Sequence, residues 1–186
     1  MSNNELYISV DIEASGPCPP TYSMLSIGAC VVGDSETSFY AEFRPISDQA
    51  VPEAIKIVGK SLEHFAASGR DPKAVMQEFG AWIKSVSHGM NPVFVGFNAA
   101  FDWAFVNWYF HIYLGRNPFG IAPLDIKSYF MGLAGCTWED TRSSRIPERF
   151  KGIAEQTHNA LDDAKSQGQM FERMHRYPRA LQHEGG

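Results

Sequence analysis

Residues 6–13, LYISVDIE, alternate strictly between two kinds of side chain. Every second residue from Leu6 to Ile12 is aliphatic, and the residues between and after them carry hydroxyl or carboxyl groups. A period of two residues is typical of a β-strand, because successive side chains point to opposite faces. Asp11 and Glu13 therefore share one face, with Cα atoms roughly 6 to 7 Å apart. The pattern predicts a first strand that carries two neighbouring carboxylates.

The rest of the chain indicates an α/β domain. Gly33 and Asp34 form a turn between two apolar segments, which predicts an antiparallel meander, and Asp71 and Pro72 suit the start of a helix. Strands are expected at 24–32, 38–45 and 91–98, and helices at 71–86, at 101–114 and from about Asn159. Strands first, then alternating helix and strand, imply a mixed sheet. We expect a single domain spanning residues 1–186.

Composition narrows the class of protein. The 186 residues are 44% hydrophobic and 13% aromatic, which is enough for one core. No segment approaches the ~18 consecutive apolar residues of a membrane span, so we expect a cytoplasmic protein without membrane contact. Cys18, Cys30 and Cys136 match no metal or disulfide spacing and are expected as reduced thiols. The net charge of −5 argues against a broad basic nucleic-acid surface, but a small metal-holding site would remain compatible with it.

Two further motifs carry candidate functional residues. Asp102, in NAAFDWAF, lies at an expected strand-to-helix join, where α/β proteins commonly place their sites. His158 and Asp163, in HNALDDA, lie at the start of the last expected helix. Each motif also has a purely structural reading, because acidic residues stabilise the first turn of a helix and paired carboxylates occur on solvated sheets. The three motifs gain meaning only from their combination.

In this order the motifs resemble the DEDDh 3′–5′ exonuclease superfamily, which includes the proofreading exonucleases, ribonuclease T and oligoribonuclease. The family's elements correspond here to Asp11 with Glu13, to Asn98–Asp102, and to His158 with Asp163. The segments SMLSIGACVV and IAPLDIKSYF resemble two further parts of the family pattern. The resemblance implies an RNase H-like fold, a mixed β-sheet flanked by helices. It also implies that the four carboxylates hold two Mg²⁺ or Mn²⁺ ions, with Asp11 bridging both, and that His158 acts as general base.

The resemblance also implies a substrate. Hydrolysis would begin at the 3′ end of single-stranded RNA or DNA and release 5′-mononucleotides, and analogy alone favours RNA slightly over DNA. The candidate substrate contacts are Ala14, Ser15, Met24, Leu25, Asn98, Trp103, Arg142 and Arg145. Trp103 suits core packing better than base stacking, and Asn98 suits a structural hydrogen bond at least equally well. Arg142 and Arg145 could contact phosphates or could lie on a solvated loop.

Other residues fall outside the predicted site. Asp125 is expected to cap the helix that begins at Ile126, and Asp162 to support the start of the last helix. The five remaining histidines are expected to be structural or exposed: His64, His88, His111, His175 and His183. The prolines of GPCPP at 16–20 depart from the family pattern directly behind the first motif, which weakens inference of the substrate from relatives.

The expected helix 101–114 is apolar on nearly all sides, which indicates deep burial or a homodimer interface.

Two alternative functions stay open. A non-catalytic nucleic-acid-binding scaffold of the same fold would not need a self-repelling carboxylate cluster. A mononucleotide phosphohydrolase would keep the chemistry and change the substrate.

Overall fold

A mixed five-stranded sheet forms the centre of the computed structural model, which describes residues 4–152 and 158–183, with side chains as far as Tyr177. The strands are β1 (Glu5–Ala14), β2 (Met24–Val31), β3 (Asp34–Glu42), β4 (Asn91–Gly96) and β5 (Leu124–Asp125). Their order in the sheet is β3-β2-β1-β4-β5. The first three strands pair antiparallel, as the meander predicted, and β4 and β5 continue the sheet in parallel. The expected RNase H-like mixed sheet is confirmed.

Helices connect and cover the strands. They are α1 (Pro52–Val58), α2 (Leu62–Ser68), α3 (Pro72–Ser87), α4 (Ala100–Leu114), α5 (Ile126–Ala134) and α6 (Ala160–His183), with short 3₁₀ turns η1 (Trp138–Thr141) and η2 (Ser143–Arg145). Asp71 caps α3 by accepting a hydrogen bond from the Ala74 N–H, as predicted. Asp125 caps α5 through the Ser128 N–H, also as predicted. Neither α1, which is short and buries no residue, nor α2 was expected from the sequence.

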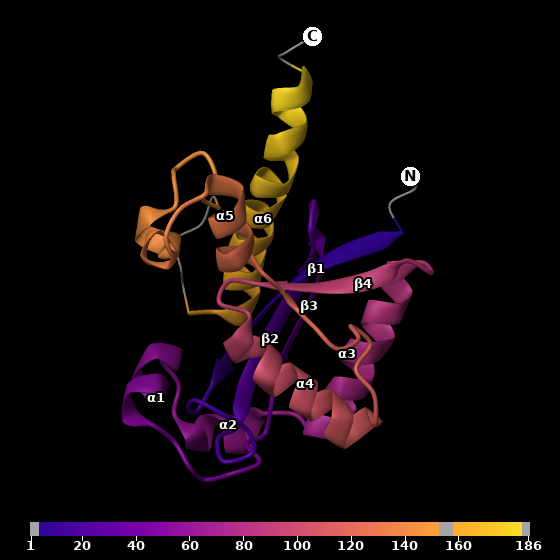
Figure 1. Cartoon of the computed structure of the whole chain (residues 1–186). Coiled ribbons are helices and arrows are strands. Elements are labelled where there is room, and N and C mark those ends of the chain that lie inside the picture. Colours follow the sequence, from indigo (N-terminus) through magenta and orange to yellow (C-terminus); the bar gives the residue numbers. More distant parts are fainter. Residues whose placement is uncertain (1–3, 153–157, 184–186) are drawn as a thin grey trace.

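The two faces of β1 pack against different helices. Ile8, Val10 and Ile12 lie in a core shared with α3 and α4. On the other face, Tyr7 packs against Phe171 of α6, with ring centroids 5.2 Å apart. Figure 1 shows α6, in yellow, crossing the sheet on the side away from α3 and α4. The face that carries Asp11 and Glu13 is therefore partly covered by α6.

Deep burial accounts for most of the apolar character of α4. Phe105, Val106, Tyr109 and Phe110 are fully buried, whereas the Ile112 side chain is 58% exposed. Trp103, two residues before Phe105, packs edge-on against Phe94 with ring centroids 5.3 Å apart, which confirms its expected role in the core.

The three cysteines are free thiols, as predicted. Among the described helices, none combines the length and the apolar character that a bilayer crossing requires.

Candidate active site

Asp11 and Glu13 lie near the carboxyl end of β1 and face α6. Asp11 Oδ1 accepts a hydrogen bond of 2.6 Å from Gln167 Nε2, which lies in α6. The residues that the structure describes make no hydrogen bond to Asp11 Oδ2. The first motif therefore presents carboxylate oxygens in the space between the strand end and the start of α6.

Asp102 approaches Asp11 and Glu13 because the pairing between β1 and β4 ends before these residues. The parallel pairing of β1 with β4 ends at Ser9 and Val95, so the N–H of Ile12 has no partner on β4. The Ile12 N–H instead donates a hydrogen bond of 3.1 Å to Asp102 Oδ1, in the first turn of α4. Asp102 is only 4% exposed. The second motif is thus held directly on the strand that carries the first.

The start of α6 supplies the third motif. The Asn159 side chain accepts hydrogen bonds from the N–H groups of Leu161 and Asp162, which caps the helix. Asp163, in the first turn, is 5% exposed, whereas His158, just before the helix, is exposed and has a left-handed φ of 55°. One ligand atom each from Glu13, His158 and Asp163 lies within 4.8 Å of the other two.

Gly28 allows α6 to come this close to the sheet. It lies opposite Asp11 in the β1–β2 pairing. A Cβ atom at Gly28 would lie 2.2 Å from the carbonyl carbon of Ala160 and 2.3 Å from the Leu161 nitrogen. A side chain here would therefore push the helix start, and with it Asp163, away from β1. Sequence reasoning did not single out Gly28, because nothing local marks the close approach.

The clustered carboxyl groups repel one another. Burial, followed by the charges of Asp102, Glu13 and Asp163, raises the pKa of Asp11 well above its usual value. Burial and the charge of Asp163 raise the pKa of Glu13 to about 7. Burial raises the pKa of Asp102 to about 8, although the hydrogen bond from the Ile12 N–H opposes the change. Without a cation, the cluster retains protons that isolated carboxyl groups would lose.

The chemistry of this donor set fits a divalent cation. Carboxylate oxygens are the hard ligands that Mg²⁺ and Mn²⁺ prefer, and positive charge would offset the burial and the mutual repulsion that raise the three pKa values. The residues that would hold the ions are Asp11, Glu13, Asp102 and Asp163. His158 lies close enough to Glu13 and Asp163 to act on a water molecule at the same site or to bind an ion itself.

Four predicted substrate contacts are buried in this structure. Ala14, Ser15, Met24 and Leu25 are each at most 6% exposed. The Ser15 hydroxyl already donates to the Gln49 carbonyl and accepts from the Ser23 N–H, both at 2.9 Å. The structure places Ala14 and Ser15 directly after Glu13, so they adjoin the cluster. Their contact with a nucleotide stays a prediction.

The remaining predicted contacts differ in their surroundings. Asn98 is exposed, with a left-handed φ of 65°, and its carbonyl accepts a hydrogen bond from the Phe101 N–H at the start of α4. Arg142 pairs with Glu139 at 2.9 Å, and Arg145 pairs with Asp140 at 3.0 Å. These acidic partners lie just before the arginine-rich loop and neutralise much of its charge. Phosphate contact by the two arginines therefore stays a prediction.

Asp125 has a larger role than the predicted helix cap. Its Oδ2 accepts from the N–H and the hydroxyl of Ser128, at 2.9 and 2.6 Å. Its Oδ1 accepts a hydrogen bond of 3.0 Å from the Ala99 N–H, three residues before Asp102. Asp125 thereby holds the loop that leads to Asp102. The helix cap was predictable because Asp125 directly precedes the helix that begins at Ile126. The hydrogen bond to Ala99 was not predictable, because it depends on the pairing of β4 with β5.

Of the other histidines, His88 and His111 are exposed, His64 contacts Ser68 and Glu42, and His175 stacks on Phe171. They are structural or exposed, as predicted. The side chain of His183 lies outside the described residues.

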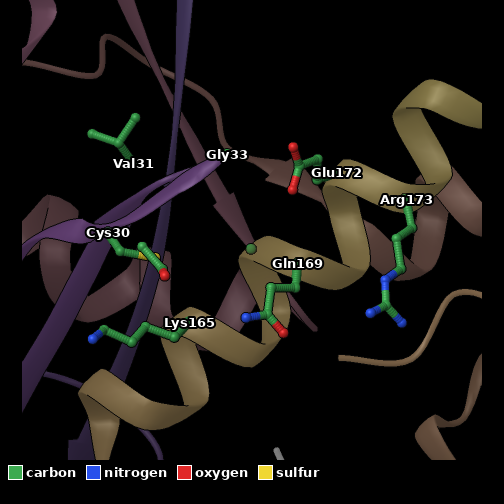
Figure 2. A pocket seen from close by; sticks show the side chains of 9 residues that line it. Cys30, Val31, Gly33, Lys165, Gln169, Glu172 and Arg173 are labelled. Carbon is green, nitrogen blue, oxygen red and sulfur yellow. The ribbon is translucent and has the colours of Figure 1, made fainter. Parts of the chain in front are cut away.

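A separate hollow of about 270 Å³ lies between the β2–β3 turn and α6. It is lined by residues of α6 that point away from Asp163, such as Lys165 and Glu172. Figure 2 shows that the charged ends of Lys165, Glu172 and Arg173 point in different directions. Lys165 pairs with Glu36, and Glu172 pairs with Arg176. Because these charges have other partners and do not converge, the carboxylate cluster is the better candidate site.

Comparison with known proteins agrees with the fold and the motifs. The RNase T family model, described as exonuclease, matches residues 8–171. The 3′–5′ DNA exonuclease Cap18 of Escherichia coli is 48% identical over 171 residues, which are 91% of each chain. The nuclease domain of 3′hExo, a DEDDh family member solved with rAMP, has a TM-score of 0.74 at 16% identity and covers 92% of both chains. A zinc-bound complex of E. coli exonuclease I with single-stranded DNA has a TM-score of 0.68 at 20% identity, covering 96% of this chain and 42% of that one.

An RNase H-like sheet with acidic residues grouped at the end of its central strand defines the class as nuclease-like. With the family match and the identity to Cap18, the chain belongs to the RNase T family of exonucleases. It is therefore a nuclease by family.

Proposed function

We propose that this protein hydrolyses single-stranded DNA from the 3′ end and releases 5′-mononucleotides. The observation that carries the proposal is the convergence of the three motifs. Asp102 bonds to the backbone between Asp11 and Glu13, and Asp163 lies within reach of Glu13 and His158. Four carboxylates and one histidine from three distant parts of the chain thus form one cluster.

Two Mg²⁺ or Mn²⁺ ions, held by the four carboxylates, would supply Lewis acidity at the scissile phosphate and lower the pKa of the attacking water. His158, which lies beside Glu13 and Asp163, accepts a proton from that water. The water oxygen forms a new bond to the phosphorus, and the bond from phosphorus to the O3′ of the preceding nucleotide breaks. The leaving O3′ takes a proton from the solvent and His158 returns its proton to the solvent, which gives a shortened strand and a 5′-mononucleotide.

The choice of DNA rests on the relative. Cap18 is named a DNA exonuclease and is 48% identical to this chain. The slight preference for RNA expected from the sequence rested on analogy with the wider family, so the comparison shifts the proposal toward DNA. RNA stays the alternative substrate.

The same cluster argues against a binding scaffold. A scaffold gains nothing from carboxyl groups that are buried together, where burial and then mutual repulsion raise the pKa values of Asp11 and Glu13. A mononucleotide phosphohydrolase would use the same residues, so only substrate assays separate it from an exonuclease.

The test uses 5′-labelled single-stranded DNA and RNA oligomers of the same sequence, with Mg²⁺ or Mn²⁺, beside an Asp163→Asn variant. We expect a DNA ladder that shortens from the 3′ end, which is absent with the variant and with a 3′-phosphorylated oligomer. Faster shortening of RNA would reverse the substrate proposal. If neither polymer shortens with either metal, the exonuclease proposal is wrong, and release of phosphate from mononucleotides would then favour the phosphohydrolase.

We also propose a homodimer, which was predicted from the apolar sequence of α4. Exposed Phe101 and Ile112 on α4 support it, although most of the helix is buried within the subunit. Light scattering tests this directly, because a mass near 20.7 kDa would mean a monomer.

A further inference from the structure

Gln167 connects the three motifs through two hydrogen bonds. It lies in α6, one turn after Asp163, and is 7% exposed. Its Nε2 donates to Asp11 Oδ1 at 2.6 Å. Its Oε1 accepts from the Phe97 N–H at 2.9 Å. Phe97 follows β4 and begins the loop that leads to Asp102, so one side chain joins the helix of Asp163 to both other motifs.

The Phe97 N–H fixes the orientation of the Gln167 amide. A backbone N–H can only donate, so the amide oxygen must face Phe97. The amide nitrogen must then face Asp11, where it can only donate. A flipped amide would bring two donors together at Phe97 and two acceptors together at Asp11. The protein backbone therefore decides that Asp11 meets a hydrogen-bond donor at Oδ1.

This donor limits how Asp11 can turn. With Oδ1 held by Gln167 Nε2, rotation of the carboxylate is restricted, and Oδ2 is the oxygen that this bond leaves for an ion. Without the bond, repulsion from Asp102 and Glu13 would favour turning Asp11 away from them. A group that holds a ligand in its binding orientation raises metal affinity, because less order is lost on binding.

We propose that Gln167 is a positioning residue, which holds Asp11 in the orientation that binds the divalent ions. This inference rests on the proposed function, in which Asp11 is a metal ligand. Gln167 acts only through Asp11 and needs no contact with the nucleic acid. It is outside every motif from which the site was predicted.

The test compares wild-type protein with Gln167→Met, which keeps the approximate length but loses both hydrogen bonds, and with Gln167→Asn, which keeps an amide too short to reach both partners. Ser87→Ala is the matched control, because the buried Ser87 hydroxyl donates to the Ile83 carbonyl in α3, remote from the cluster. Mn²⁺ affinity is measured by calorimetry on the full chain, and the unfolding temperature of each variant shows that it is folded.

We expect both Gln167 variants to bind Mn²⁺ about 10- to 100-fold more weakly, as is typical when a group that orients a metal ligand is removed. Their exonuclease rate should require correspondingly more Mn²⁺ and return toward the wild-type rate at saturation. Ser87→Ala should lose stability without any change in Mn²⁺ affinity.

Unchanged Mn²⁺ affinity and unchanged metal dependence of the rate in a folded Gln167→Asn or Gln167→Met variant would overturn the proposal. Gln167 would then serve only to satisfy the Phe97 N–H. Failure of wild-type protein itself to bind Mn²⁺ or to shorten DNA would instead overturn the proposed function, so the two failures are distinguishable.

Discussion

The N–H of Ile12, which lies between Asp11 and Glu13 in β1, donates a hydrogen bond of 3.1 Å to Asp102 Oδ1. Ile12 and Asp102 are 90 positions apart in the chain, so this bond couples the placement of the second motif to the backbone of the first. It also leaves Asp102 one oxygen that is not used in this contact. The structural hydrogen bond and the proposed metal binding would therefore use different oxygens of the same carboxylate.

Two substitutions at Asp102 should separate these roles. Asp102→Asn keeps an oxygen that can accept from the Ile12 N–H, so the fold should persist while Mn²⁺ binding and DNA shortening are lost. Asp102→Leu leaves the buried N–H unpaired and should be less stable than Asp102→Asn by about 1–3 kcal/mol. Urea unfolding of the metal-free variants measures the difference, and equal stabilities would contradict a structural role for the bond.

The metal-free protein should lose stability as the pH rises. Glu13 and Asp102, with pKa values of about 7 and 8, bind more protons in the folded state than in the unfolded state. Their protonation therefore favours folding at low pH, and this advantage declines from the unfolded pKa of ~4 up to pH 7–8.

Thermal unfolding in EDTA should show this decline between pH 5 and 8.5. Mn²⁺ should stabilise the protein most at the upper end of that range, and Asp102→Asn should show a smaller decline. A metal-free unfolding temperature that rises steadily over this range would argue against the proposed charge repulsion.

A side chain at Gly28 should displace the start of α6. Gly28→Ala places a methyl group against the Ala160 backbone, and overpacking of this kind costs about 1–3 kcal/mol. Because Asp163 moves with the helix, Mn²⁺ affinity should fall as well. Gly132→Ala is the control, because Gly132 lies in α5 with open space around it, and alanine there should stabilise by about 0.5–1 kcal/mol. Unchanged metal affinity in Gly28→Ala would show that the close approach does not set the site.

His158 can be assigned as general base or as metal ligand by one substitution. If it is the base, His158→Gln should lower kcat about 10²- to 10⁴-fold while Mn²⁺ affinity stays within about threefold of wild type. Its proximity to Glu13 and Asp163 makes ligation the competing role. A fall in Mn²⁺ affinity that matches the fall in rate would favour ligation.

The sequence predicted those parts of the fold that depend on local patterns. The alternation from Leu6 to Glu13 located β1, and Asp71 with Pro72 located the start of α3. The helices α1 and α2 were not predicted, because each has only 7 residues, which is shorter than the stretch over which a helical period can be recognised.

The candidate site likewise combines residues that local motifs predicted with residues whose roles depend on the folded structure. Family-like motifs located the five central residues, although their metal binding and catalysis stay predictions. The roles of Gln167, Gly28 and the Asp125–Ala99 bond depend on segments that meet only in the folded protein. No local pattern could have revealed them.

The most direct test of the account is a crystal structure of the wild-type protein with Mn²⁺ and a 5′-mononucleotide, with the ions located by anomalous scattering. The account predicts two Mn²⁺ peaks, both bound by Asp11, with Glu13, Asp102 and Asp163 completing the site and Gln167 still bonded to Asp11. Saturating Mn²⁺ with no peak at Asp11, or ions bound only elsewhere on the protein, would contradict it.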